Sequence, residues 1–162
     1  MNNKILTLSL YFFIILLFDA CGFKPIYSEK NYELNNDYYA VLNSNNSKEV
    51  KDIFNEFFKS KNKSNFYKIK VEINERSIPL LTNSDGTVSK YKIEIYAAFT
   101  LIELSSNELI YTNFTRGFNS YSTDSSEYNT EENKKIAIKQ ATREALQILI
   151  SKIQNRITKI SK

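Results

Sequence analysis

The chain has 162 residues, enough for one domain of ordinary size and too few for two domains that each bury a core. Hydrophobic residues make up 42% of the chain and charged residues 25%, which indicates a folded protein and argues against global disorder. There is no histidine and a single cysteine, Cys21, so intramolecular disulfides, Cys/His zinc sites and mechanisms that need an imidazole base are excluded. The formal net charge of +4 is well below the clustered excess of a nucleic-acid-binding protein.

An uncharged, almost wholly apolar run, Ile5–Phe18, follows Lys4 near the start of the chain. Membrane spans need about 20 apolar residues, whereas runs of about 10–14 are more often the cores of signal peptides. The alternative is a buried helix at the start of the domain, but the run has no polar face. Residues 1–20 are therefore predicted to be a signal peptide, and export makes nucleic acid an implausible partner.

The residues that follow the apolar run resemble the bacterial lipobox, in which a cysteine after a small residue becomes the lipid-bearing first residue of the mature protein. Ala20 and Cys21 fit this pattern, whereas Phe18 and Asp19 depart from it. Cys21 is therefore the predicted lipidation site, with an incidental thiol as the alternative. Each buried CH₂ contributes about 0.8 kcal/mol, so two or three acyl chains anchor a protein firmly. By the same resemblance, Gly22 favours sorting to the outer membrane.

The first part of the domain is polar and rich in Asn, apart from Tyr38–Leu42, which are predicted to form one short strand. A helix is predicted from Asn46 to about Lys61, because Asn46 and Glu49 have the spacing of a capping box. Its apolar residues recur at helical spacing and form one stripe: Val50, Ile53, Phe54, Phe57 and Phe58.

The hydrophobic period then changes to two, which predicts a strand over 67–76 with one buried face and one solvated face. Pro79 and the Asp-Gly pair at 85–86 are expected to bracket a connection, since proline cannot continue a strand ladder. Alternation resumes over 90–103. The two segments are therefore predicted to form an antiparallel pair.

A third strand over Leu109–Tyr121 precedes a long final helix. Asn129 and Glu132 are the predicted capping pair at its start, and apolar residues at spacings of three or four continue the helix from Ile138 to Ile160. Within 133–162, eight cations stand against the single anion Glu144. Such a basic face is most often simply solvated, and the alternatives are an acidic partner surface or anionic lipid head groups.

This order of elements predicts an α+β fold, an about four-stranded, mostly antiparallel sheet with two helices packed on one face. The helices are expected to contribute Phe54, Phe57, Leu149 and Ile153 to the core. The face of the sheet that they cover is expected to contain Ile69, Val71, Ile93 and Ile95.

A carboxylate pair, Glu72 and Glu94, is the only catalytic device left in the sequence. If the strands instead place Glu72 opposite Lys92 and Lys70 opposite Glu94, these residues form ordinary cross-strand ion pairs. The chain has three glycines, no glycine-rich phosphate loop and no cluster with metal-ligand spacing. We therefore expect a binding protein without a cofactor or metal, not an enzyme.

Three short motifs follow one another along the chain: CGFKPIY at 21–27, Asp-Gly-Thr at 85–87 before a long strand, and Ser-Tyr at 120–121 before the last helix. In this order and spacing the chain resembles the LPS-assembly lipoprotein LptE family, particularly its alphaproteobacterial branch, from residue 21 to about residue 158. It departs from that branch at 119–122, which lack an Asn after the Tyr, and in being rich in Lys, Asn and Ile.

The resemblance implies a single LptE-like lipoprotein domain over 21–162, anchored through Cys21 on the periplasmic side of the outer membrane. Such a protein sits in the lumen of the β-barrel LptD, aids barrel assembly, plugs it, and binds lipopolysaccharide during delivery to the cell surface. The alternatives are a structural or scaffolding outer-membrane lipoprotein and a periplasmic lipid carrier, which would need an apolar pocket.

Cations on the solvated face of the predicted strands are the candidate lipopolysaccharide-binding residues, because they suit the phosphates of lipid A. The alternative is that they are ordinary solvated residues in ion pairs. The candidates are Lys68, Lys70, Arg76, Lys90 and Lys92.

Overall fold

The computed structural model describes residues 38–43, 45–58 and 66–160. They all belong to one compact unit, Leu34–Lys162. The predicted signal peptide 1–20, the predicted lipidation site Cys21 and the rest of the motif at 21–27 lie outside the described residues.

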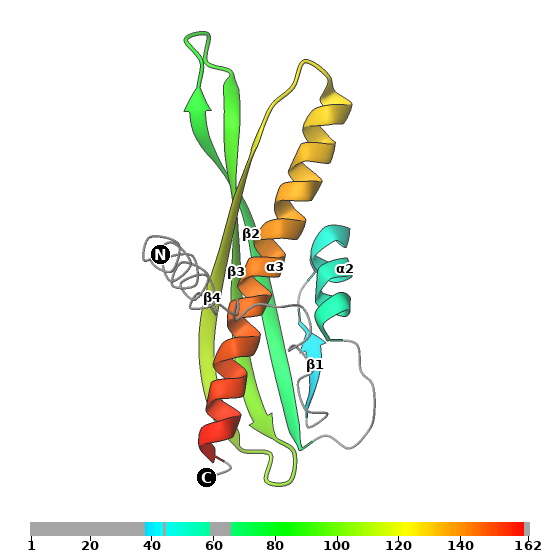
Figure 1. Ribbon diagram of the computed structural model, residues 1–162, viewed down its shortest axis with the longest axis vertical. Coiled ribbons are helices and arrows are strands. Elements are labelled where there is room, and N and C mark those ends of the chain that lie inside the picture. Colours follow the sequence, from blue (N-terminus) through cyan, green and yellow to red (C-terminus); the bar gives the residue numbers. More distant parts are fainter. Residues whose placement is uncertain (1–37, 44, 59–65, 161–162) are drawn as a thin grey trace, which may run out of the picture. The chain divides into compact units, whose positions relative to one another are not determined.

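Four strands form one mixed sheet in the order β1-β2-β3-β4 (Figure 1). β1 is parallel to β2, and the other two neighbouring pairs are antiparallel. The predicted α+β class and the short first strand are confirmed. The elements are β1 (Tyr38–Leu42), α2 (Lys48–Phe57), β2 (Tyr67–Thr82), β3 (Val88–Glu103), β4 (Leu109–Ser122) and α3 (Glu127–Ile160).

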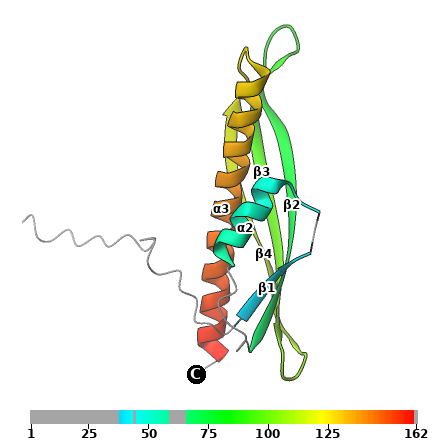
Figure 2. The same cartoon turned by 90° about the vertical axis from the view of Figure 1, so that its right-hand side faces the viewer.

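Both helices lie on the same face of the sheet (Figure 2). Alternation along the strands sends one set of side chains into the core between sheet and helices and the other set to the opposite face. The expected core residues of the sheet are buried: Ile69, Val71, Ile93 and Ile95, as are Phe54, Leu149 and Ile153 of the helices. Within the described residues, neither helix combines the length and apolar character needed to cross a membrane.

The start of α2 differs from the prediction. Ser47, not Asn46, is the N-cap residue, and its side chain makes no capping hydrogen bond. The Ser47 hydroxyl instead donates to Oε2 of Glu75 on β2, at 2.9 Å. The predicted capping box, which needs Asn46 as the N-cap residue, is therefore wrong.

α2 lies beside α3, as Figure 1 shows, and Arg143 Nη2 of α3 is 3.1 Å from Oε2 of Glu56. The stripe of α2 is buried at Phe54 but only half-buried at Phe57 and Phe58. The rings of Phe54 and Phe58 are 4.7 Å apart, and the Phe58 ring meets that of Tyr38 edge to face. The expectation that Phe57 is a core residue is thus corrected to a half-buried position.

β2 continues through Pro79 to Thr82, so the prediction that Pro79 ends the strand is wrong. Proline is tolerated there because β1 pairs with β2 only as far as Val71, which leaves Pro79 on an edge where no ladder partner needs its missing N–H. The pairing with β3 shifts register between Pro79 and Leu81. The predicted turn is present: Asp85 Oδ1 accepts hydrogen bonds from the hydroxyl and backbone N–H of Thr87, which lower the pKa of that carboxyl.

β4 and α3 approach each other closely through small residues. A Cβ at Gly117 would clash with the backbone carbonyl of Ala141 and come within 2.7 Å of the Ala145 nitrogen. Two residues earlier, the buried Thr115 hydroxyl donates to the carbonyl oxygen of Ala145 at 2.9 Å. This contact fixes the face that β4 presents to the opposite side of the sheet.

The exposed edge of β4 is covered by side chains. The Phe118 N–H donates to Glu144 Oε2 at 2.7 Å, and Lys152 Nζ donates to the Phe114 carbonyl oxygen at 2.8 Å. Asn113 Oδ1 accepts from the Phe114 N–H at 2.7 Å. Because unpaired edge groups invite strand addition, these bonds hinder further pairing at this edge.

α3 begins at Glu127, earlier than predicted, and the expected Asn129–Glu132 capping pair is wrong. Ser126 Oγ instead accepts from the Asn129 N–H, at 3.4 Å. The Asp124 carboxylate accepts from the Ser126 N–H and the Asn129 amide, and these bonds hold its pKa below its usual range. The observed helix contains seven cations and four anions, a charge of +3, because its earlier start adds Glu127, Glu131 and Glu132 to the residues counted over 133–162.

Candidate functional site

The face of the sheet opposite the helices, here called the outer face, is the surface on which sequence reasoning placed the candidate binding residues. It is formed by the side chains that alternate with the buried ones. Its register is set by the ladders β2–β3 and β3–β4, in which Arg76 lies opposite Glu94 and Glu94 opposite Phe118.

Two of the five candidate cations, Lys68 and Lys70, lie at the end of the sheet where β1 is paired. They stand opposite Tyr39 and Val41 of β1. The ammonium of Lys68 is 5.8 Å from the centre of the Tyr39 ring. This arrangement allows a favourable cation–π contact at a partly solvated site.

The other three candidates lie farther along the sheet, toward the β2–β3 hairpin. Arg76 is six residues beyond Lys70, about 20 Å along the strand. Lys92 is opposite Ile78 and Ser120, and Lys90 is two residues nearer the hairpin, opposite Leu81 and Ser122. The structure thus divides the five candidates into two separate groups instead of one patch.

The candidate carboxylate pair is not brought together. Glu72 lies opposite Ala98, and Glu94 lies opposite Arg76, four residues or about 13 Å along the ladder from Glu72. The alternative pairings are also wrong, since Lys70 is opposite Thr100 and Lys92 is opposite Ile78. Neither register considered from the sequence occurs, because the hairpin turns between Thr82 and Val88, which face each other, and the two shifts near Pro79 cancel.

A group of side chains that sequence reasoning missed lies on β3 and β4 of the outer face. We call Tyr96, Phe114, Arg116 and Phe118 the aromatic–arginine strip. The rings of Tyr96 and Phe114 are stacked with centres 5.2 Å apart, and the Arg116 guanidinium carbon is 5.8 and 5.6 Å from these two ring centres. The Lys92 ammonium is 4.9 Å from the centre of the Phe118 ring.

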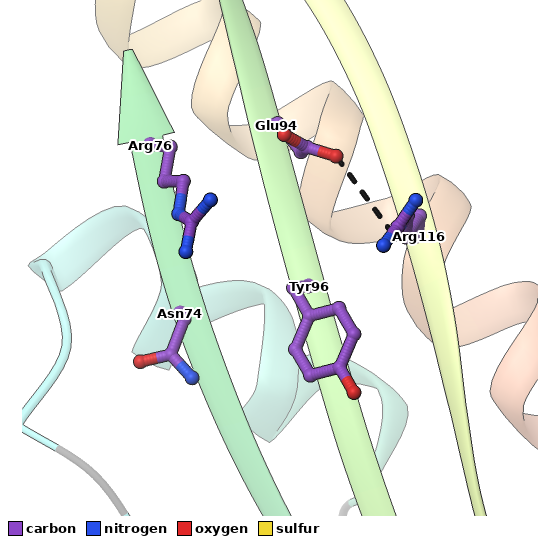
Figure 3. A pocket seen from close by; sticks show the side chains of 5 residues that line it. All are labelled: Asn74, Arg76, Glu94, Tyr96 and Arg116. Carbon is purple, nitrogen blue, oxygen red and sulfur yellow. Dashed lines mark ion pairs between the residues drawn. The ribbon is translucent and has the colours of Figure 1, made fainter.

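A small pocket of about 220 Å³ opens beside this strip (Figure 3). Residues of β2, β3 and β4 line it, and in Figure 3 the side chain of Glu94 points toward that of Arg116. Arg116 Nε and Glu94 Oε1, on its wall, are 3.8 Å apart. The lining residues are Asn74, Arg76, Glu94, Tyr96 and Arg116.

The pocket is chemically suited to polar recognition. Two guanidinium groups, an amide and a phenol supply donors, and Glu94 supplies an acceptor that already faces Arg116. In the described part of the chain, no three His, Cys, Asp or Glu side chains gather in a way that could hold a metal ion.

The signal for the strip was present in the sequence, in the alternation of Phe114, Arg116 and Phe118 with Thr115 and Gly117. Thr115 and Gly117 are not large apolar residues, so the sequence does not show which face of this strand is buried. Thr115 and Gly117 are nevertheless buried, because α3 packs directly on them.

The basic face of the last helix is largely engaged within the domain. Lys134 and Lys135 pair with glutamates one turn earlier, at 3.6 and 2.7 Å. Arg143 reaches Glu56, Lys152 reaches the backbone of β4, and the Arg156 guanidinium carbon is 5.7 Å from the centre of the Tyr111 ring. These contacts favour the interpretation that this face mainly stabilises the domain.

This chain is similar to several solved structures in its three-dimensional fold. No family model matches the chain, and no curated protein matches its sequence. A solved structure described as a candidate lipoprotein from Caulobacter crescentus has a TM-score of 0.61 at 10% identity, covering 76% of this chain and 91% of that one.

Two further solved structures are similar. Rare lipoprotein B from Shewanella oneidensis has a TM-score of 0.51 at 16% identity, covering 74% of this chain and 97% of that one. An uncharacterized lipoprotein B from Nitrosomonas europaea has a TM-score of 0.52 at 12% identity, covering 70% and 79%. The chain shares the fold of these lipoprotein structures.

Proposed function

We propose that this chain is an outer-membrane lipoprotein of the LptE type. It complexes with the β-barrel LptD, aids its assembly, plugs it, and binds lipopolysaccharide for delivery to the cell surface. The fold carries this proposal: the helix-covered sheet is similar to that of lipoproteins from Caulobacter, Shewanella and Nitrosomonas. The motifs at 21–27, 85–87 and 120–121, in that order, support it from the sequence.

Cys21 is the proposed anchor, which holds the domain on the periplasmic side of the outer membrane. A single acyl chain binds membranes marginally, whereas several together hold firmly. The domain itself needs no apolar membrane-facing surface under this proposal.

The outer face supports a location inside a barrel. The lumens of outer-membrane barrels are polar and water-filled, so a domain that plugs one needs a polar, charged surface. Along the middle of the sheet the outer face presents Glu72, Asn74, Arg76 and Glu94, opposite the apolar core.

The candidate cations support lipopolysaccharide binding by charge. Phosphate groups form short, strong hydrogen bonds with ammonium and guanidinium groups. Lys68 and Lys70 form one candidate group on the outer face, and Arg76, Lys90 and Lys92 form the other.

Isolation of the tagged full chain from outer membranes in mild detergent tests this function. We expect a protein of barrel size, identified as LptD by mass spectrometry, and lipopolysaccharide in the same fraction. Recovery of the chain without a barrel would favour the scaffolding alternative, and recovery with lipid but without a barrel would favour the lipid carrier. Either of these two results contradicts the proposal.

A further inference from the structure

The aromatic–arginine strip exposes large apolar side chains on the outer face of the sheet. Phe114 and Phe118 lie two residues before and two residues after Arg116 on β4. Their side chains are 46% and 43% exposed. Single exposed apolar residues need no explanation, but clustered ones mark interaction sites. Among the described elements, both helices lie on the other side of the sheet, so neither covers the strip (Figure 2).

Side chains of the strip are already packed on one another in the domain by itself. The Phe114 ring is stacked on Tyr96, and the Arg116 guanidinium contacts both rings. Lys152 of α3 reaches around the sheet edge to within 5.9 Å of the centre of the Phe114 ring. Side chains that are already ordered lose little conformational entropy on binding, which favours affinity.

The composition of the strip is that of a protein interface. Tyr and Arg are enriched at the residues that dominate binding energy, and aromatic residues in general are enriched at interface cores, where Lys is depleted. The candidate lysines lie to either side of the strip: Lys70 is opposite Thr100, and Lys92 is opposite Ser120.

Lipopolysaccharide fits the strip less well than a protein does. Glu94, whose side chain is 18% exposed, stands beside Arg116 and would repel a phosphate placed there. The adjoining pocket is lined mostly by charged and polar groups, whereas an acyl chain needs an apolar site.

The charge of the outer face indicates the kind of protein surface that fits. Over β2, β3 and β4 it contains six cations and two anions, Glu72 and Glu94. A complementary surface therefore carries carboxylates, which steer association and set the register of docking. The cations are Lys68, Lys70, Arg76, Lys90, Lys92 and Arg116.

We propose that the aromatic–arginine strip is the centre of the surface through which this domain docks on a protein partner, and that the partner presents carboxylates to Arg116 and Arg76 and apolar groups to Phe118. This inference rests on the proposed function, under which the partner is the barrel LptD and the carboxylates lie on its lumen wall. Of the candidate lipopolysaccharide cations, Arg76 then serves the partner, and Lys68, Lys70, Lys90 and Lys92 remain for lipopolysaccharide.

Site-specific photo-cross-linking in intact cells tests the inference. The photoreactive amino acid benzoylphenylalanine replaces Phe118 in one version of the full chain and Phe114 in another. As a control it replaces Tyr128 of α3, which is 73% exposed and lies outside the strip. We expect light-dependent adducts with LptD from Phe118 and Phe114 at least about tenfold stronger than from Tyr128.

Two charge and polarity variants provide a second measurement. Arg116→Glu and Phe118→Ser are each expected to lower the recovery of LptD with the tagged chain by about tenfold or more, as expected for residues that dominate an interface. The matched controls are Lys139→Glu on α3 and Phe66→Ser, which change an exposed cation and an exposed phenylalanine outside the strip. Both should retain recovery within about twofold, and thermal melting should verify that all four variants are folded.

The outcomes separate this inference from the proposed function. If the unaltered chain recovers no barrel protein, the proposed function and the inference both fail. If the unaltered chain recovers LptD, but the strip yields no adducts and both strip variants recover as much as their controls, the inference alone is overturned. Adducts from Phe118 to lipopolysaccharide instead of protein also overturn it.

Discussion

Gly117 of β4 lies directly against Ala141 of α3, so close that a single added Cβ would collide with the helix backbone. The contact brings the final helix onto the sheet and buries Gly117 and Thr115. Because side chains alternate along a strand, it also turns Arg116 and Phe118 toward the outer face. The packing of the core and the surface proposed for docking therefore depend on the same segment of β4.

Gly117→Ala is expected to destabilise the domain by at least about 2 kcal/mol, because the new methyl group meets backbone that cannot rotate away. Urea unfolding followed by circular dichroism measures the change. Ser120→Ala, on the exposed side of the same strand, is the control and should change stability by less than about 0.5 kcal/mol. Equal stability of the two variants would mean that β4 and α3 do not make this contact.

The two phenylalanines of α2 should differ in their contribution to stability. Phe54 is 5% exposed and Phe57 is half-buried, so Phe54→Ala should cost about 3–5 kcal/mol and Phe57→Ala clearly less. Parallel unfolding curves of the two variants check the order. The reverse order would show that the stripe of α2 is rotated relative to the core.

The candidate lysines of the outer face should act independently in binding isolated lipopolysaccharide. Lys92 lies opposite Ile78, eight residues along β2 from Lys70, or about 26 Å, so Lys70→Glu and Lys92→Glu should each weaken binding and their effects should add. The binding of the unaltered protein should fall as salt shortens the Debye length below about 10 Å. Titration with purified lipopolysaccharide at low salt measures each affinity.

The control for the lysine variants is Lys139→Glu, on the exposed side of α3. If this change weakens binding while Lys70→Glu and Lys92→Glu leave it unchanged, the outer-face candidates are wrong. The last helix would then be the place to search, beginning with Arg143 and Arg156.

The proposed anchor predicts the mass of the protein in the membrane. Chain extracted from membranes should begin at Cys21 and exceed its peptide mass by several acyl chains. Cys21→Ala should release the protein from the outer membrane, because the acyl chains supply the binding energy. A mature chain with a free thiol at Cys21 would contradict lipidation.

The elements of this fold were largely predictable because each strand has one buried and one solvated face. The alternation of Ile69, Val71 and Ile73 predicted β2, and that of Ile93 and Ile95 predicted β3, without knowledge of their neighbours. Their antiparallel pairing was also predicted correctly, but the register of the pair was not. Register depends on where the strands turn and bulge, and Pro79 was read as a strand end when it lies on a free edge.

The strip was missed because its origin is tertiary. The alternation of buried and exposed residues in β4 is visible only if Thr115 and Gly117 count as buried. They are buried because they pack on Ala141 and Ala145 of α3, which have small side chains. The capping prediction for α2 failed for a related reason, whereas at α3 the neighbouring residues Asp124 and Ser126 take the place of the predicted pair. Ser47 bonds to the sheet, a contact between residues far apart in the sequence that local spacing does not encode.

Measuring the delivery of lipopolysaccharide to the cell surface tests the central claim most directly. Cells depleted of this chain receive a pulse of labelled lipopolysaccharide precursor, and the labelled fraction that reaches the outer leaflet is followed over time. The proposed function predicts that this fraction falls together with the amount of correctly folded LptD, and that the unaltered chain restores both. Normal surface delivery and normal levels of folded LptD in depleted cells would contradict it.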